Sequence, residues 1–368
     1  MNLTKAKAAV LVGANKPFEI REFPISAAPA GMAKIRLVAS GVCGTDIHIH
    51  RGLIPTNPPT IIGHEFIGCV EEIAEEDSKK CGISVGDNVI VDIAVPCGKC
   101  VLCRAGDDAN CVNMGLTNAG SLDVAPYLYG GYTEYNYTPI TNIIKIPAEL
   151  DPTMTAVFAC PGPTAIHAFR LAEQANCQIE KANVAVVQGL GPVGMFAVMY
   201  LGALGIKNVI AVTLEDPKRE EMALKMGATE VMHIAADGSV DHIIKRAHEL
   251  SEGGIGADVV FEASGSIKAV PQGMQMLRNR GTYLIPGQYS NSGNVEIAPQ
   301  MITFNALHMI GSSQYSLSDV AAYLDFLKNN PQLHDGIKAM VTKYSVSDVN
   351  QAFDDAKARK NIKTVLVK

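Results

Sequence analysis

Residues 183–205 read NVAVVQGLGPVGMFAVMYLGALG, and this stretch decides how the second half of the chain folds. The apolar run NVAVVQ predicts a buried β-strand, and MFAVMYLGALG predicts the helix that follows it. The glycines between them have the spacing G-x-G-x-x-G: the first permits a tight turn, the second lets backbone approach a pyrophosphate, and the third allows close helix–strand packing. The N–H groups at the start of the helix then face the phosphates. The pattern predicts a dinucleotide-binding turn made by Gly189, Gly191, Pro192, Val193 and Gly194.

Strands and helices keep alternating after this turn. NVIAVT precedes the helical pattern PKREEMALKMGA, and ADVVFEASG and GTYLIPGQ continue the series. Such alternation builds a parallel doubly wound α/β sheet, so we assign residues 156–300 to a Rossmann dinucleotide-binding domain. Residues 1–155 instead carry short β-branched runs broken by Gly, Pro and Asn, which predicts an antiparallel β domain. Residues 301–368 lose the alternation and are expected to return to that first domain.

The composition is that of a globular protein. The chain has 368 residues, of which 48% are hydrophobic and 18% are charged, and this length makes two domains the default expectation. The net charge of −6 and the lack of a long basic run argue against nucleic acid and anionic membranes as partners. No apolar run reaches membrane-spanning length. Nine cysteines, an odd number, argue against a secreted disulfide framework and favour a cytoplasmic protein that uses thiols for metals.

Four of these cysteines lie in residues 97–111, which read CGKCVLCRAGDDANC. Their spacing is C-x2-C-x2-C-x7-C, and gaps of two let a tight loop direct successive thiolates at one centre. Four thiolates suit tetrahedral zinc and leave no position open for a substrate. Iron–sulfur ligation also uses short gaps, so spacing alone does not identify the metal. We predict a structural metal site, with zinc favoured, made by Cys97, Cys100, Cys103 and Cys111.

The second strand of the dinucleotide domain runs into the sequence VIAVTLEDPKRE. An acidic residue about 20 positions after the glycine turn commonly binds the ribose hydroxyls. Here Leu214 occupies that place and Glu215 follows it, so Glu215 is a candidate for the ribose contact. Alternatively, Thr213, Lys218 and Arg219 would surround a 2′-phosphate. NAD and NADP both stay open, with NAD favoured because two adjacent carboxylates would repel a phosphate.

Three further candidate ligands stand in distinctive settings, Cys43 in GVCGTDIHIH, His64 in GHEF and Cys160 in FACPGPTAIHAF. The order of GVCGTD, GHE, the four-cysteine loop, GGYTEY and GLGPVG resembles that of the zinc-dependent medium-chain dehydrogenases, the family of alcohol and polyol dehydrogenases. The resemblance runs from about residue 7 to the C-terminus. It implies a GroES-like antiparallel β catalytic domain joined to the Rossmann cofactor domain.

The same resemblance implies a catalytic metal site. Cys43, His64 and Cys160 resemble the three protein ligands of a catalytic zinc, a set that leaves the fourth position for water or substrate. Glu65 resembles the neighbouring carboxylate that lies behind the zinc. Asp46 resembles the acceptor that orients His64 through its other ring nitrogen.

Two residues resemble the proton relay of the family. Thr45 would accept the hydroxyl proton of the alcohol, and His48 would pass it toward solvent, which suits a side chain with a pKa near 6.5. His50 lies two residues further on and competes for the role of His48.

The resemblance implies an oxidoreductase that transfers a hydride between an alcohol, such as a secondary alcohol or a polyol, and NAD or NADP. It also implies two zinc ions in each chain, a small-molecule substrate, and assembly as a homodimer or homotetramer. The alternatives are a zinc-free quinone or enone reductase on the same scaffold, and a dinucleotide-binding sensor without turnover. The intact set of Cys43, His64 and Cys160 speaks against both.

Overall fold

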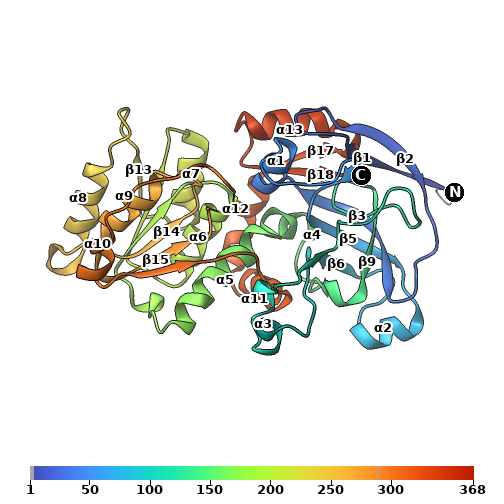
Figure 1. Ribbon diagram of the computed structural model, residues 1–368, viewed down its shortest axis with the longest axis horizontal. Helices are drawn as coiled ribbons and strands as arrows, with labels where there is room; N and C mark the ends of the chain where they lie inside the picture. Colours follow the sequence, from blue (N-terminus) through green and yellow to red (C-terminus); the bar gives the residue numbers. More distant parts are fainter. Residues whose placement is uncertain (1–3, 289) are drawn as a thin grey trace. The chain divides into compact units, whose positions relative to one another are not determined.

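The computed structural model describes residues 4–288 and 290–368. The chain forms two compact units (Figure 1), unit 1 from Met1–Cys160 with Gln314–Lys368, and unit 2 from Pro161–Ser313. Both boundaries fall later in the chain than the sequence boundaries at residues 155 and 300. Among the described residues, no helix combines the length and the apolar character needed to cross a bilayer.

Unit 2 is built on a parallel β-sheet. Its strands are β11 (Val184–Gln188), β12 (Asn208–Thr213), β13 (Glu230–His233), β14 (Ala257–Glu262), β15 (Leu277–Ile285) and β16 (His308–Gly311). They form a six-stranded sheet in the order β13-β12-β11-β14-β15-β16, and every neighbouring pair is parallel. The order reverses beside β11, as in doubly wound dinucleotide-binding folds, so the predicted Rossmann class is confirmed. Residues 301–313 belong to this unit because β16 supplies the sixth strand.

The helices of unit 2 cover this sheet. They are α5 (Pro161–Gln174), α6 (Pro192–Ala203), α7 (Pro217–Met226), α8 (Asp241–Leu250), α9 (Ala269–Met276) and α10 (Pro299–Phe304), with the short 3-10 turns η4 (Ile179–Lys181) and η5 (Glu252–Gly254). Helix α6 contacts β11, β12, α5 and α7. Phe169 of α5 stacks on Tyr200 of α6 with ring centroids 4.7 Å apart, and on Phe261 of β14 at 5.2 Å. Packing on several sides explains why α6 is apolar around most of its surface.

Unit 1 is mostly antiparallel β-structure. Its strands are β1 (Lys5–Leu11), β2 (Glu19–Pro24), β3 (Met32–Gly41), β4 (Thr60–Ile61), β5 (Glu65–Glu72), β6 (Asn88–Val91), β7 (Ala94–Val95), β8 (Gly115–Leu116), β9 (Tyr135–Pro139), β10 (Ile143–Lys145), β17 (Val341–Ser345) and β18 (Lys363–Val367). The largest sheet has the order β10-β6-β5-β3-β18-β17, with β9 also pairing with β3. The pair β17–β18 is parallel, whereas β18 and β5 both run antiparallel to β3. Strand β18 therefore lies inside this sheet, between β3 and β17.

Short helices connect these strands. They are α1 (Gly44–His50), α2 (Glu75–Cys81), α3 (Val101–Arg104), α4 (Pro152–Thr155), α11 (Leu317–Asn329), α12 (His334–Ala339) and α13 (Val349–Lys357), with the 3-10 turns η1 (Asp108–Asn110), η2 (Ile140–Asn142), η3 (Ala156–Phe158), η6 (Pro331–Leu333) and η7 (Val346–Asp348). Asp151 caps α4 by accepting a hydrogen bond from Met154 N at 2.8 Å. Proline at the first helical position completes this start.

The core of unit 1 joins the two ends of the chain. The ring of Phe18 contacts that of Phe353 edge-on at 4.7 Å between centroids, and Tyr132 meets both rings edge-on at 6.0 and 5.7 Å. Edge-to-face aromatic contacts of this kind add stability beyond the burial of their area. Helix α13 is thereby fixed against the sheets that carry the candidate metal ligands.

Candidate metal centres and dinucleotide site

Four side chains with metal-binding atoms gather at one point in unit 1. Cys43 precedes α1, and Cys160 follows η3. His64 and Glu65 stand where β5 begins. In the antiparallel pair β3–β5, Gly41 lies opposite Glu65, which brings the end of β3 beside the start of β5. One ligand atom from each of the four side chains lies within 4.8 Å of the others.

The two cysteines of this cluster favour different protonation states. A hydrogen bond from the Cys160 thiol lowers the pKa of Cys43 well below its ordinary value, and the charge of His64 adds to this effect against the opposing effect of burial. The same hydrogen bond, together with burial, raises the pKa of Cys160. Cys43 is therefore the thiol of the pair that loses its proton more readily, and Cys160 would lose its proton on binding a metal ion, because the thiolate is the form that binds a metal.

Asp46 fixes the orientation of His64. Its side chain is fully buried, and its Oδ1 lies 3.2 Å from His64 Nδ1. Its other oxygen accepts hydrogen bonds from Tyr132 Oη at 2.7 Å and from Cys43 N at 2.9 Å. Because Nδ1 is engaged by a carboxylate, Nε2 is the ring nitrogen left for a metal. The contact expected between Asp46 and His64 is present, and it is supported by Tyr132, which the sequence analysis did not single out.

Lys363 of β18 contacts Glu65 inside the cluster. Its Nζ donates to Glu65 Oε2, although 298 positions separate the two residues, and both side chains are almost completely buried. Burial raises the pKa of Glu65 to about 7, against the opposing effect of the Lys363 charge. A Cβ atom at Gly41 would overlap with Glu65 Oε2, so the site depends on glycine there. Sequence reasoning missed Lys363; the available signal was a lysine inside the apolar strand IKTVLV.

The donor set fits a zinc ion. Glu65 Oε1 is buried and has no hydrogen-bond partner among the described residues. Leaving such an oxygen unpaired away from water costs free energy, and a cation at the cluster would remove that cost. Two sulfurs and one imidazole nitrogen are donors that catalytic zinc accepts. Cys43, His64 and Cys160 could thus hold the ion, with Glu65 behind it.

The candidate relay residues lie on α1. Thr45 is in the first turn, where its Oγ1 lies 3.7 Å from Cys43 Sγ. His48 is half-buried, one turn further along the helix. Burial and the charge of Arg51 lower the pKa of His48. A neutral imidazole at pH 7 can accept a proton, as a relay requires.

His50 has a different environment. Its ring is buried between Phe18 and Phe353, with centroids 5.5 Å from each. Its Nε2 lies 2.9 Å from the carbonyl oxygen of Lys16. These contacts commit His50 to the packing of unit 1, which leaves His48 as the histidine that meets the requirements of a relay.

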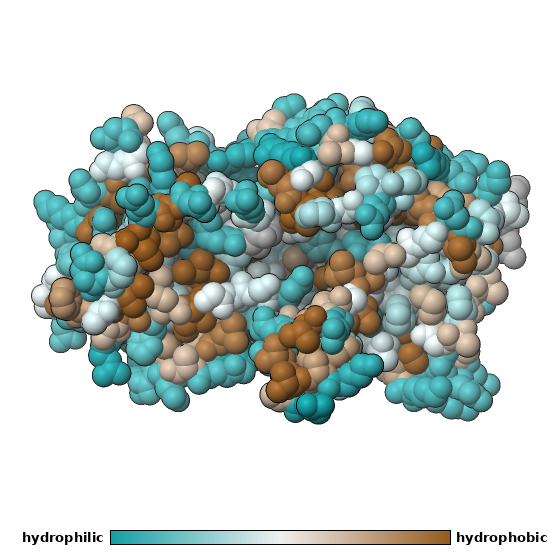
Figure 2. Space-filling view, in the orientation of Figure 1, coloured by the Kyte–Doolittle hydropathy of each residue, from teal (hydrophilic) through white to brown (hydrophobic). Residues whose placement is uncertain are grey.

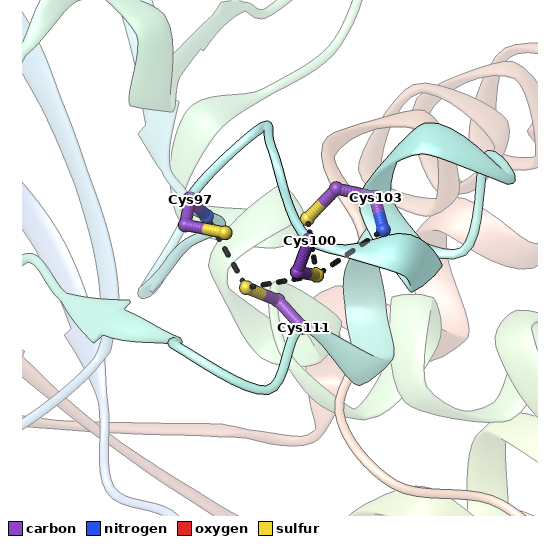
Figure 3. A group of neighbouring side chains, drawn as sticks. All are labelled: Cys97, Cys100, Cys103 and Cys111. Carbon is purple, nitrogen blue, oxygen red and sulfur yellow. Dashed lines mark hydrogen bonds between the residues drawn. The ribbon is translucent and has the colours of Figure 1, made fainter.

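The four-cysteine loop encloses a second candidate centre (Figure 3). The sulfur atoms of Cys97, Cys100, Cys103 and Cys111 lie within 4.8 Å of one another, and all four thiols are free of disulfides. Cys100 Sγ is 3.4 Å from Cys103 Sγ and 4.0 Å from Cys111 Sγ. Four sulfurs bound at about 2.3 Å to one tetrahedral ion stand about 3.8 Å apart. The loop therefore fits a single ion of the size of zinc.

Backbone N–H groups of the loop point at the sulfurs. Cys103 N donates to Cys100 Sγ at 3.4 Å, and this hydrogen bond is the main reason that the pKa of Cys100 falls to about 6. Cys97 N and Asn113 N donate to Cys111 Sγ at 3.2 and 3.4 Å. Hydrogen bonds to the charged form favour the thiolate of Cys100, the form that a metal needs, whereas burial and the neighbouring thiols raise the pKa of Cys103 to about 12.

The loop buries little apolar surface of its own. Apolar side chains gather over α3 on the outside of the molecule (Figure 2), and Val101 of α3 is 66% exposed. Val112, next to Cys111, is also 66% exposed. Because hydrophobic burial contributes little here, the fold of the loop depends on the four sulfurs and on what they bind.

The glycine turn of unit 2 has the features expected of a dinucleotide site. Gly189 has a φ of 95°, and a Cβ there would lie 2.7 Å from Ser264 Cα. A Cβ at Gly194 would overlap with the carbonyl oxygen of Gly189, which shows how closely α6 packs on the turn. A Cβ at Gly191 would meet no atom within 4 Å. Gly191 caps α6, so the open space beside it lies at the helix N-terminus, where phosphates bind. Pro192 and Val193 form the first turn of α6.

The candidate ribose residues differ in accessibility. Thr213 is buried at the end of β12, whereas Leu214 and Glu215 are exposed beyond it. Arg219 is buried, donates from Nη1 to Leu190 O at 3.0 Å, and has its Nε 3.0 Å from Asp216 Oδ2. The structure therefore does not bring the Arg219 guanidinium to the surface, where it would meet a 2′-phosphate. The reason is that this guanidinium is held by its hydrogen bond to the carbonyl oxygen of Leu190, within the glycine turn.

Known proteins resemble both units. The family model for the alcohol dehydrogenase GroES-like domain matches residues 29–148, and that for the zinc-binding dehydrogenase matches residues 192–329. A probable D-xylulose reductase A of Arthroderma otae is 30% identical over 97% of this chain and 96% of its own length. The chain belongs to the zinc-type medium-chain dehydrogenase family. The predicted combination of a GroES-like and a Rossmann domain is thereby confirmed.

The likeness of this dehydrogenase to other members extends over its whole length. The 5-exo-hydroxycamphor dehydrogenase of Pseudomonas putida is 29% identical over 98% of each chain. The crystal structure of an alcohol dehydrogenase from Thermotoga maritima superposes with a TM-score of 0.88, at 27% identity and 99% coverage of both chains. The enzyme is therefore an oxidoreductase of this family.

Replacing one loop cysteine tests the structural centre. Cys103→Ser should lower the thermal unfolding midpoint of the dehydrogenase by about 5 °C or more, because a structural ion contributes folding free energy. Cys81→Ser, outside both clusters, should change it little. A strong chelator should lower the midpoint of the wild type more than that of Cys103→Ser. Equal midpoints for the two variants would contradict the assignment.

Two alanine substitutions separate the roles of the glycines. Gly191→Ala should leave thermal stability unchanged, because the new Cβ meets no atom, yet weaken NADH binding about tenfold or more by blocking the approach of the pyrophosphate. Gly194→Ala should instead lower the unfolding midpoint, because its Cβ overlaps with backbone. Fluorescence titration with NADH and thermal unfolding measure both effects. Tight NADH binding by Gly191→Ala would place the phosphates elsewhere.

Proposed function

We propose that this enzyme transfers a hydride between an alcohol, of the secondary-alcohol or polyol class, and NAD, and that it carries one catalytic and one structural zinc ion. The observation that carries the proposal is the convergence of Cys43, His64 and Cys160 beside the unpaired oxygen of Glu65. Relatives named for xylulose and hydroxycamphor support an alcohol as the substrate class.

The residues around the cluster prepare it for this chemistry. Zinc held by Cys43, His64 and Cys160 would act as a Lewis acid and lower the pKa of the substrate hydroxyl. Asp46 keeps the His64 ring oriented, and its buried charge increases the basicity of that ring.

The proton of the alcohol is assigned to a path along α1. A threonine hydroxyl both accepts and donates hydrogen bonds, so Thr45, beside Cys43, can take the proton and pass its own onward. His48 accepts that proton, since its lowered pKa keeps the ring neutral at pH 7. A dinucleotide held at the glycine turn would supply the nicotinamide that accepts the hydride.

The cofactor of this reaction is proposed to be NAD. The only arginine proposed from sequence for a 2′-phosphate is tied to Leu190 O and Asp216. Glu215 is exposed at the end of β12, where its carboxylate can accept hydrogen bonds from ribose hydroxyls and would repel a phosphate.

Loss of one catalytic ligand should abolish turnover. We expect Cys43→Ser to reduce kcat/KM for a panel of secondary alcohols and polyols by about a thousandfold or more, with a thermal midpoint close to that of the wild type. Metal analysis should find two zinc ions per chain in the wild type and one in the variant. Cys69→Ser is the matched control, and it should retain both. Full activity in Cys43→Ser would favour a zinc-free reductase, and an inactive zinc-replete wild type would favour a sensor.

Reversing one charge tests the cofactor preference. Glu215→Arg should raise kcat/KM with NADP relative to NAD by about tenfold or more, because it replaces repulsion by attraction at the 2′ position. Glu221→Arg makes the same change of charge at an exposed position of α7 and should leave the ratio unchanged. A ratio that shifts equally in both variants would mean that only long-range charge matters.

We also propose that the enzyme assembles as a homodimer or homotetramer through unit 2. Strand β16 ends the sheet, and an unpaired strand edge is a template for pairing with a second copy. Phe304, close to β16 in the chain, is 78% exposed, which a protein interface would explain. Light scattering should give at least twice the mass of the 39.1 kDa chain. A monomer at micromolar concentration would contradict the proposal.

A further inference from the structure

A polar hollow lies in unit 2, away from the glycine turn. Its volume is about 230 Å³, and it opens to solvent. Residues next to η4 and at the starts of β14, β15 and β16 supply the lining, so it lies at the amino-terminal edge of the sheet. The side chains that matter below are Lys181, Asp258, Arg278, Arg280, Thr282 and His308.

Positive charge exceeds negative charge around this hollow, in a chain whose net charge is −6. Asp258 is the one carboxylate among its lining residues. Its Oδ2 accepts hydrogen bonds from Asn183 N and Val184 N at 2.8 and 2.9 Å, and its Oδ1 accepts from Arg278 Nε at 2.6 Å. Both oxygens of Asp258 are therefore engaged. Within the described part of the chain, neither Lys181 nor Arg280 forms an ion pair with a carboxylate.

Arg278 is oriented before any ligand arrives. Besides the bond from Nε to Asp258, its Nη1 donates to Asn279 O at 2.7 Å. None of the described hydrogen bonds uses Nη2, which leaves that edge of the guanidinium for a ligand. A guanidinium fixed in advance loses little conformational entropy on binding, and its planar donors match the oxygens of a phosphate.

Arg280 is held beside it by an uncommon backbone conformation. Its backbone φ is 59°, a value that residues other than glycine seldom adopt. Its N–H donates to Asn305 O at 2.7 Å. This hydrogen bond ties Asn305, at the end of α10, to the irregular part of β15, and Arg280 lines the hollow. Thr282 adds a hydroxyl to the lining, and His308 adds an imidazole.

The geometry points to a binding site for a phosphoryl group, in the form of inorganic phosphate or a small phosphate monoester, on Lys181, Arg278 and Arg280. The volume admits a ligand smaller than a dinucleotide, since pockets for larger ligands are about 300–1,000 Å³. Charge-assisted hydrogen bonds from arginine to phosphate oxygens supply the affinity.

This site is separate from the cofactor site. Strand β11 runs for five residues from the hollow to the glycine turn. At about 3.3 Å per residue, the two lie about 16 Å apart. A phosphoryl ligand here would therefore bind together with the dinucleotide, and its affinity does not depend on the proposed alcohol chemistry.

The test is a titration of the ¹⁵N-labelled full-length enzyme with inorganic phosphate at constant ionic strength, with sodium chloride as the charge control. The amide NMR signals of residues 176–182 and 278–282 should shift with phosphate in a saturable way and should not shift with chloride. The double variant Lys181→Gln/Arg280→Gln should bind phosphate about tenfold more weakly or worse, because two charge-assisted contacts are lost. The thermal unfolding midpoint of the double variant, measured without phosphate, verifies that this variant folds.

Two further variants make the result decisive. Lys207→Gln removes an exposed lysine that lies just before β12 and does not line the hollow, so phosphate affinity should stay within about twofold of the wild type. Gly191→Ala should also leave the signals at the hollow unchanged. The inference is overturned if these signals do not saturate, if Lys207→Gln and the double variant weaken binding equally, or if phosphate shifts only the signals of residues 189–194.

Discussion

The buried charges around Cys43, His64, Glu65 and Cys160 constrain the whole of unit 1. Taking carboxylates, a lysine and thiolates out of water is costly unless each has a partner. Asp46 faces His64, and Lys363 faces Glu65. The Cys43 thiolate and the remaining Glu65 oxygen are left for a cation. Strands β3, β5 and β18 must therefore stay in register, because a shift of one residue would turn these side chains to the other face of the sheet.

The two candidate metal centres are built on different principles. The four-cysteine loop takes all its donors from fifteen consecutive residues. The loop buries few apolar groups and is organised by N–H···S hydrogen bonds. The cluster of Cys43, His64, Glu65 and Cys160 takes its donors from distant segments and is organised by the sheet. We expect the four-cysteine loop to fold only when it binds its metal, whereas the cluster around Cys43 should form before metal binding. The first behaviour suits a role in stability, and the second suits a role in chemistry.

The sequence could predict the sites that are built from consecutive residues. The glycine turn needs one strand, three glycines and one helix in succession, so its geometry is legible in residues 183–205. The four-cysteine loop is equally local. For the distant ligands Cys43, His64 and Cys160, the order of motifs indicated a common site, and the structure brings them together. Pattern alone would have left each as an isolated thiol or imidazole.

What the sequence could not predict depends on long-range packing. The burial of Arg219 follows from its bond to Leu190 O, and the choice between His48 and His50 follows from the aromatic rings around the latter. Residues 301–313 lack a visible helix–strand alternation, yet they complete the parallel sheet. The contact between Lys363 and Glu65 joins two strands whose contacting residues are 298 positions apart in the chain.

That last contact orders events during synthesis. Unit 2 is a continuous segment, so its sheet can form as soon as residue 313 has been made. Unit 1 has to wait, because β18 pairs with β3 and carries Lys363, the ion-pair partner of Glu65 within the described residues. Domains generally fold as units while the chain emerges. Unit 2 can thus fold before unit 1, and the synthesis of β18 decides when Lys363 reaches Glu65.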